Sequence, residues 1–163
     1  MKKILLIIGI ITLFCSCQKD FSVWKEYNDA ELKNYEANLG KTLPVDTFWV
    51  SKSGLLVEVF HWGQTSIMPK LSSLVFCNQS GKLVDDTSFQ SLDLRSYYVG
   101  DNPVKGLQEI LCQMPQGSHF KIYVPYELAY GKNGQKSINT FYIPPYSVLI
   151  FDIEIVEVYQ NTP

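Results

Sequence analysis

The alternation of apolar and polar residues predicts that most of the chain after residue 54 is β-strand. Apolar or alternating segments cover 55–62, 74–77, 82–84, 96–99, 119–124 and 148–158. The last segment has the period-two pattern of a strand that buries one side. Its buried face would carry Leu149, Phe151, Ile153 and Ile155.

A cluster of turn-forming residues, Asn78–Gly81, separates the apolar run 74–77 from the run 82–84. Two short β-prone runs on either side of such a cluster are typical of a β-hairpin. We therefore expect the chain to reverse at 78–81.

Two segments have helical rather than strand spacing. The shorter one is internal and ends at Pro115 and Gly117; its apolar stripe is Val104, Leu107, Ile110, Leu111 and Met114. The other follows the N-terminus, and its looser stripe is Trp24, Tyr27, Leu32, Tyr35 and Leu39. Asn28 or Asp29 would cap this helix and Gly40 would end it. The pattern leaves open whether the helix packs on the domain or acts as a spacer.

Several strands with short connections favour antiparallel pairing, and one internal helix would cover one face of the sheet. The expected fold class is therefore α+β, with the second face of the sheet in water and a helical extension at the N-terminus.

The first residues are typical of an export signal. Lys2 and Lys3 precede the apolar run Ile4–Phe14, which is too short for a membrane span of about 20 residues. Ser16-Cys17 resembles a bacterial lipobox, which implies acylation of Cys17; an ordinary cleaved signal or an uncleaved anchor is the alternative. By resemblance to Gram-negative sorting signals, Gln18 favours the outer membrane. We expect a lipoprotein signal peptide at 1–16, a lipidated tether with the helical extension at 17–52, and the folded domain at 53–160.

Charge and composition exclude some functions. The net charge is −2, and removal of residues 1–16 leaves 12 basic against 16 acidic side chains, so nucleic-acid binding is not expected. His61 and His119 lack neighbouring ligands at metal-site spacing, and we expect no metal or cofactor. Cys77 and Cys112 are expected to be free thiols, with a disulfide as the alternative. The ten Tyr, nine Phe and three Trp fill a core or line an apolar cleft.

Four segments, taken in order, resemble the FKBP-type peptidyl-prolyl isomerase family. They are Gly106–Met114, Pro115–Ser118, the motif Val-Pro-Tyr-Glu-Leu-Ala-Tyr-Gly at 124–131, and Ile-Pro-Pro-Tyr-Ser-Val-Leu-Ile-Phe-Asp at 143–152. Upstream, Gly81–Phe89 is similar to a further family stretch, with Asp86 in place of a Gly. The resemblance covers roughly 54–159 and implies an antiparallel sheet wrapped around one short helix.

The resemblance also implies a site. Tyr130 matches the hydroxyl that binds a substrate carbonyl, Val104 the backbone N–H that donates a second hydrogen bond, and Phe151 a catalytic wall residue. The expected substrate-binding positions are Phe89, Gln90, Leu107 and Ile143. For Tyr130 the alternative is a plain loop tyrosine, and for Phe151 and Ile143 it is ordinary core packing.

The chain departs from the family at several pocket positions. Leu107 replaces the usual Trp, Gln90 an Asp, Gln79 a Tyr and Arg95 a Phe, and the loop between Gly131 and Ile143 is about four residues longer. We expect the two glutamines to remove hydrogen bonds that orient the pocket, and activity to fall.

The leading hypothesis is an envelope-anchored monomeric isomerase that acts on X-Pro bonds in exported proteins. The alternatives are a non-catalytic peptide-binding or chaperone module, and a purely structural lipoprotein.

Overall fold

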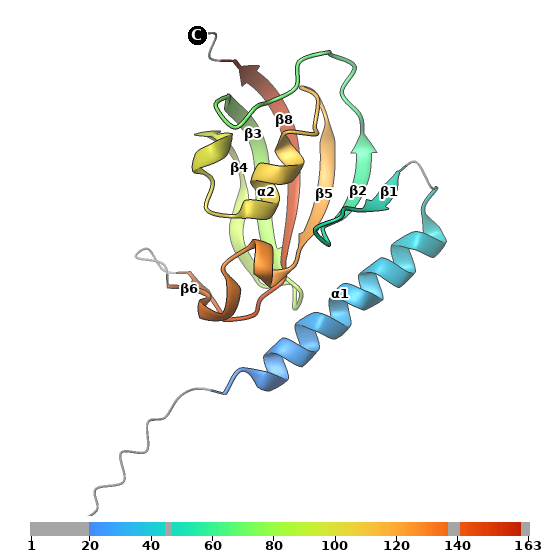
Figure 1. Ribbon diagram of the computed structural model, residues 1–163, viewed down its shortest axis with the longest axis vertical. Coiled ribbons are helices and arrows are strands. Elements are labelled where there is room, and N and C mark those ends of the chain that lie inside the picture. Colours follow the sequence, from blue (N-terminus) through green and yellow to red (C-terminus); the bar gives the residue numbers. More distant parts are fainter. Residues whose placement is uncertain (1–19, 45–46, 137–140, 161–163) are drawn as a thin grey trace, which may run out of the picture.

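The computed structural model describes residues 20–44, 47–136 and 141–160 (Figure 1). The expected signal peptide 1–16, the lipidation site Cys17 and Gln18 lie outside the described residues. The helices are α1 (Ser22–Thr42) and α2 (Lys105–Leu111), with short 3-10 turns at Val99–Asp101, Tyr126–Leu128 and Gly131–Asn133. The strands are β1 (Phe48–Val50), β2 (Leu56–His61), β3 (Leu74–Leu83), β4 (Ser88–Tyr98), β5 (His119–Val124), β6 (Gln135–Lys136), β7 (Tyr142–Ile143) and β8 (Leu149–Tyr159).

Six of the strands in the described residues form one sheet in the order β1-β2-β5-β8-β3-β4, and every neighbouring pair is antiparallel. The short β6 and β7 pair with each other beside it. This confirms the expected α+β class. The sheet includes residues 48–50, which precede the domain start expected at residue 53.

The short helix α2 packs across one face of the sheet (Figure 1). Its predicted apolar stripe is confirmed, because all five of its residues are at most 2% exposed. They pack with the inward residues of β8, which are Leu149, Phe151, Ile153 and Ile155. The regular helix is shorter than its stripe, since residues 112–114 continue as turns that still bury Met114.

The predicted hairpin at 78–81 is wrong. β3 runs unbroken from Leu74 to Leu83, and the chain reverses later, where Asp86 takes a positive φ of 64°. The residues of the predicted turn pair with β8 over their whole length. Gly81 serves a different purpose: a Cβ on it would lie 2.4 Å from the Phe89 ring, so its lack of a side chain makes room for that ring.

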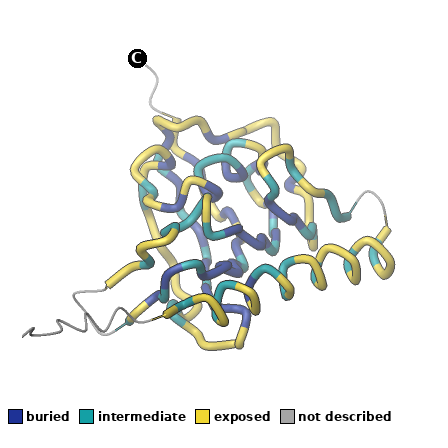
Figure 2. Tube along the Cα trace, turned by 60° about the horizontal axis from the view of Figure 1, so that its bottom comes forward, coloured by how far each residue is buried: buried dark blue, intermediate teal, exposed yellow. Residues whose placement is uncertain are grey.

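The helix α1 packs on part of the opposite face of the sheet, so this face is only partly in water, with Leu94 and Glu154 still exposed on it. Leu32, Tyr35 and Leu39 contact a second apolar cluster that includes Tyr123 and Ile150. Figure 2 shows α1 running alongside the sheet, with its outward side exposed.

The predicted ends of α1 are wrong. Asn28 is fully buried in the middle of the helix, and Gly40 lies inside it. Of the two alternatives left by the sequence, the structure therefore has the packed helix and not the spacer.

The two cysteines of the described residues, Cys77 and Cys112, are free thiols. Cys77 is buried and Cys112 is half-buried.

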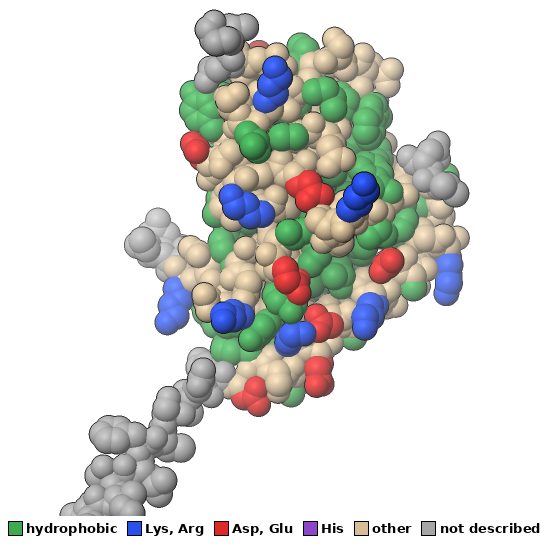
Figure 3. All heavy atoms as spheres, in the orientation of Figure 1, with side chains coloured by type: hydrophobic (Ala, Val, Ile, Leu, Met, Phe, Trp, Pro, Cys, Tyr) green, Lys and Arg blue, Asp and Glu red, His purple; other side chains and the backbone are tan. Residues whose placement is uncertain are grey.

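No helix among the described residues is long and apolar enough to cross a membrane. Lys, Arg, Asp and Glu side chains are intermixed on the face shown in Figure 3 and do not gather by sign.

Candidate active site

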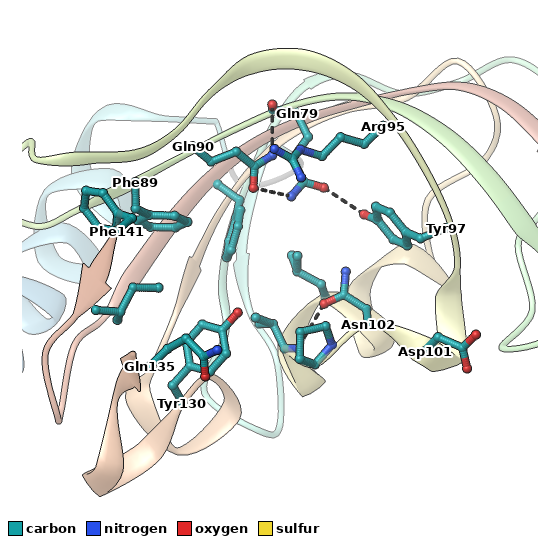
Figure 4. Close-up of a pocket in the computed structure, with 15 residues that line it drawn as sticks. Gln79, Phe89, Gln90, Arg95, Tyr97, Asp101, Asn102, Tyr130, Gln135 and Phe141 are labelled. Atoms are coloured by element: carbon teal, nitrogen blue, oxygen red, sulfur yellow. Dashed lines mark hydrogen bonds between the residues drawn. The ribbon is translucent and has the colours of Figure 1, made fainter. Parts of the chain in front are cut away.

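A cavity of about 420 Å³ opens between β4, α2 and the segments that follow β5. Small-molecule sites typically measure about 300–1,000 Å³. The residues that line it are Gln79, Phe89, Gln90, Arg95, Tyr97, Asp101, Asn102, Pro103, Val104, Leu107, Tyr130, Gln135, Phe141, Ile143 and Phe151 (Figure 4). All seven residues expected at the site from the sequence lie around this one cavity.

Aromatic rings form one wall of the cavity. Phe89 stands from β4 between the rings of Phe141 and Phe151, with ring centroids 5.9 and 5.5 Å apart, respectively. The contact with Phe151 is edge-to-face, a favourable geometry for aromatic pairs. Phe151 is 3% exposed and belongs to both the core and the cavity, so packing and lining are not alternatives for it.

Aliphatic residues complete the apolar lining. Val104 and Leu107 come from the start of α2, and Ile143 comes from β7; each is at most 6% exposed. Leu107 closes the cavity with a branched aliphatic group where the family has a flat ring. The result is an apolar cavity that can hold the ring of a proline.

Tyr130 lies just before the 3-10 turn Gly131–Asn133, and its hydroxyl points into the cavity (Figure 4). Within the described residues no side chain or backbone group is hydrogen-bonded to this hydroxyl. Burial raises the pKa of Tyr130, so the hydroxyl keeps its proton at neutral pH. Tyr130 therefore presents a free donor to any carbonyl that enters.

The backbone N–H of Val104, expected to be the second donor, is already bonded. It donates to Oδ1 of Asn102 at 2.9 Å. Gln108 holds the backbone of Asn102 in turn, because its side-chain amide donates to the backbone carbonyl oxygen of Asn102 at 2.6 Å. A substrate carbonyl would have to displace or share the Asn102 bond to use this donor.

The opposite wall of the cavity is polar. Tyr97 donates its hydroxyl proton to Oε1 of Gln79 at 2.7 Å, and Gln79 donates to Oε1 of Gln90 at 3.2 Å. Gln90 then donates to the backbone oxygen of Gln79 at 3.1 Å. The two glutamines, expected to remove orienting hydrogen bonds, thus make bonds of their own to each other and to Tyr97. Burial raises the pKa of Tyr97, which keeps it a donor.

Arg95, at the position where the family has a Phe, lies at the exposed rim of the cavity. Its guanidinium pairs with Asp93 on the same strand, with an Nε–Oδ1 distance of 2.9 Å. Exposed pairs of this kind stabilise a fold by only about 0–1 kcal/mol. The Arg95–Asp93 pair therefore carries no net charge at the rim and adds little to the stability of the wall.

Sequence reasoning missed six lining residues: Tyr97, Asp101, Asn102, Pro103, Gln135 and Phe141. Phe141 had a usable signal, since it lies two residues before Ile143, on the same side of an extended segment. Tyr97 had none, because its role depends on Gln79, which lies 18 residues away in sequence.

The site has donors and apolar walls, and the described residues that line it include no Ser, Thr, Cys, Lys or His. Rotation about an X-Pro bond needs neither a nucleophile nor a metal, because its barrier is the loss of amide resonance, about 18–20 kcal/mol. An antiparallel sheet wrapped on one short helix, with an aromatic cavity and a free tyrosine hydroxyl, defines the class of FKBP-like proline-binding domains.

Comparison with known proteins agrees with this class. The family model of the FKBP-type peptidyl-prolyl cis-trans isomerase matches residues 65–156, more than half of the chain. The chain belongs to this family.

Relatives and solved structures give the same result. The FKBP-type 22 kDa peptidyl-prolyl cis-trans isomerase of Escherichia coli (strain K12) is 34% identical over 111 residues, 66% of this chain and 52% of the relative. FkpA of the same strain is 34% identical over 134 residues, 80% of this chain and 46% of the relative. The crystal structure of FkpA from Escherichia coli superposes with a TM-score of 0.71 at 30% identity, covering 86% of this chain and 63% of that one. The chain spans about half the length of the curated relatives it matches.

Proposed function

We propose that the protein is a peptidyl-prolyl cis-trans isomerase that acts on X-Pro segments of exported proteins. The observation that carries this proposal is the free Tyr130 hydroxyl, which points into a cavity walled by Phe89, Phe151 and Ile143. Family membership supports it.

The chemistry follows from the walls and the donors. A planar amide has a larger dipole than a twisted one, so an apolar cavity that strips water from the X-Pro amide favours the twisted form. Phe151, Phe89 and Ile143 surround the proline ring. Tyr130 donates a hydrogen bond to a carbonyl of the twisted peptide. Because this form is bound more tightly than either planar isomer, the barrier falls without a covalent step.

The test is a prolyl isomerisation assay on the purified protein. We expect acceleration by the wild type and a loss of about 2- to 10-fold in kcat/KM for Tyr130→Phe, which corresponds to one hydrogen bond of about 0.5–1.5 kcal/mol. Phe151→Leu, which keeps the core filled better than Ala, is expected to reduce the rate further. Tyr142→Phe is the matched control, since Tyr142 is exposed and outside the cavity. Absence of acceleration at any protein concentration would reject the proposal.

A second candidate is a non-catalytic module that binds proline-containing peptides or holds unfolded chains. Two observations favour it: Leu107 offers less flat surface than a tryptophan, and Asn102 occupies the Val104 N–H. This candidate predicts peptide binding that depends on Phe151 without any acceleration of isomerisation.

We also propose that Cys17 is acylated and anchors the protein in the outer membrane of a Gram-negative envelope. The sequence Ser16-Cys17 after an apolar run supports this, and several acyl chains, each CH₂ contributing about 0.8 kcal/mol, give a stable anchor. Labelled fatty acid is expected to enter the wild type but not Cys17→Ser, with Cys15→Ser as control. Equal labelling of wild type and Cys17→Ser would exclude this site.

A further inference from the structure

We infer that helix α1 is a positioning element of the cavity, acting through Trp24 and Asn28 on the turn at residues 144–148. This inference rests on the proposed function for its catalytic meaning. The helix α1 lies outside the residues 65–156 that match the family, and through this turn it holds two walls of the site.

Two side chains of α1 make hydrogen bonds to this turn. Oδ1 of Asn28 accepts a bond from the backbone N–H of Val148 at 2.7 Å, and both residues are buried. Trp24 donates from Nε1 to Oγ of Ser147 at 3.0 Å, and Ser147 donates to the carbonyl of Pro144 at 2.8 Å.

Asn28 is itself held in place. Its Nδ2 donates to the carbonyl oxygen of Trp24 at 2.8 Å, one turn earlier in the helix. The amide therefore uses both its donor and its acceptor while fully buried. A buried polar group with satisfied partners specifies one arrangement of its neighbours, since any shift would leave a donor or acceptor unpaired.

The turn that α1 holds is bounded on both sides by cavity residues. Ile143, just before it, lines the cavity from β7, and Phe151, three residues after it, lines the cavity from β8. The turn also contains Tyr146 with a positive φ of 62°, a backbone region that L-residues rarely adopt. Such a conformation persists where surrounding contacts determine it.

The same turn contacts the segment that carries Tyr130. The N–H of Tyr146 donates to the carbonyl of Gly131 at 3.0 Å. A Cβ on Gly134 would lie 2.3 Å from the carbonyl oxygen of Ile143, so the two backbones are in direct contact there. A displacement of the turn is thus transmitted to Ile143 and to the loop that begins at Tyr130.

The test compares Asn28→Leu with Asn34→Leu in the full purified chain. Both remove an asparagine from α1, but Asn34 is exposed and does not contact the turn. We expect Asn28→Leu to abolish the hydrogen-exchange protection of the Val148 amide, shift the NMR signals of the Ile143 methyl groups and the Tyr130 ring, and weaken the binding of a short proline peptide about fivefold, within the range for long-range coupling. Asn34→Leu should change none of these.

A double-mutant cycle tests the second bond independently. Trp24→Phe and Ser147→Ala each remove the Trp24–Ser147 hydrogen bond. Their effects on peptide affinity are expected to be non-additive, so the double variant should bind the peptide about as well as the single variant with the lower affinity. Strictly additive effects would contradict a role through this bond.

A purely stabilising role gives a different outcome. All measurements are made well below the melting temperature. If α1 only stabilises the fold, Asn28→Leu would lower the melting temperature but leave the Ile143 and Tyr130 signals and the peptide affinity unchanged. That result would overturn the inference. The proposed function fails separately: if the wild type does not accelerate isomerisation, peptide affinity and the Ile143 and Tyr130 signals still decide the role of α1.

Discussion

At the scale of single residues, the site is organised by groups that do not resemble catalytic residues. Asn102 occupies the Val104 N–H, and Gln79 joins Tyr97 to Gln90. Gly81 makes room for Phe89. Each acts by setting what a neighbouring group can do.

The first prediction at this scale concerns Asn102. Asn102→Ala frees the Val104 N–H for a substrate carbonyl, so the affinity for a proline peptide is expected to rise about 2- to 10-fold, the equivalent of one hydrogen bond. Isothermal titration measures it, with Asn34→Ala as the control, an exposed asparagine on α1 outside the cavity. Unchanged or weaker binding would mean that the peptide does not use this donor.

The second prediction at the residue scale concerns Gly81, whose lack of a side chain makes room for the Phe89 ring. A methyl group there would lie 2.4 Å from the Phe89 ring and 3.3 Å from the Phe151 ring, so Gly81→Ala must push Phe89 aside. We expect the free energy of unfolding to fall by about 1–3 kcal/mol, as for overpacking, and peptide binding to weaken. Ser80→Ala, the neighbouring position whose side chain lies on the other face of β3, should have little effect in the same urea titration. If the free energy of unfolding of Gly81→Ala equals that of the wild type, the Phe89 ring moves aside at no cost.

At the scale of elements, β3 and its turn show why local signals mislead. The turn formers at 78–81 lie in the strand because all four residues pair with β8 and all but Ser80 also pair with β4. The reversal occurs instead at residues 84–87, where Leu83 and Thr87 share a hydrogen bond and Asp86 has the positive φ. Aspartate tolerates this conformation better than most residues other than glycine.

This turn supplies a prediction at the element scale. Asp86→Val places a β-branched residue at φ 64° and is expected to lower the free energy of unfolding by about 1–2 kcal/mol. Asp86→Asn is the matched control, because it also loses the charge that pairs with Lys82 but tolerates the positive φ. Thermal unfolding of the two variants gives the comparison. Equal melting temperatures would contradict the role given to Asp86.

At the scale of the whole molecule, a helix packs on each face of the sheet, and α1 covers its face only in part. One face packs on α2 and forms the main core and the cavity, and the other packs on α1 through Tyr35, whose ring lies 4.7 Å from that of Tyr123. Both faces are linked through the turn at 144–148. The N-terminal extension is therefore an integrated part of the fold.

Global stability should depend on pH in the alkaline range. Burial raises the pKa of the Cys77 thiol to about 12, and it also raises that of Tyr97. As pH rises, the unfolded chain loses these protons before the folded chain does. For Cys77, the contribution of the protonated thiol to the free energy of unfolding is therefore complete below the ordinary thiol pKa of 9.0 and is lost as pH rises from there toward 12. Urea unfolding should show this decline, by at most about 1.4 kcal/mol per pH unit for each proton. Cys77→Ala should flatten it more than Cys112→Ala; equal slopes would contradict the assignment.

The sequence by itself determined the fold class, most strands and the seven expected cavity residues, because these depend on local periodicity and on motifs whose order is preserved along the chain. The period of two in β8 and the stripe of α2 report which face is buried, and they do so wherever the segment packs.

Only the tertiary structure decided the rest. Gly81 prefers a turn by its local sequence, yet it lies in β3 because it pairs with Phe151 of β8, which is 70 residues away. Asn28 is a helix cap by local preference, yet it is buried because Val148, 120 residues away, needs an acceptor. Hydrogen-bond partners and close contacts between distant segments exist only once the chain has folded, so no pattern along the sequence contains them.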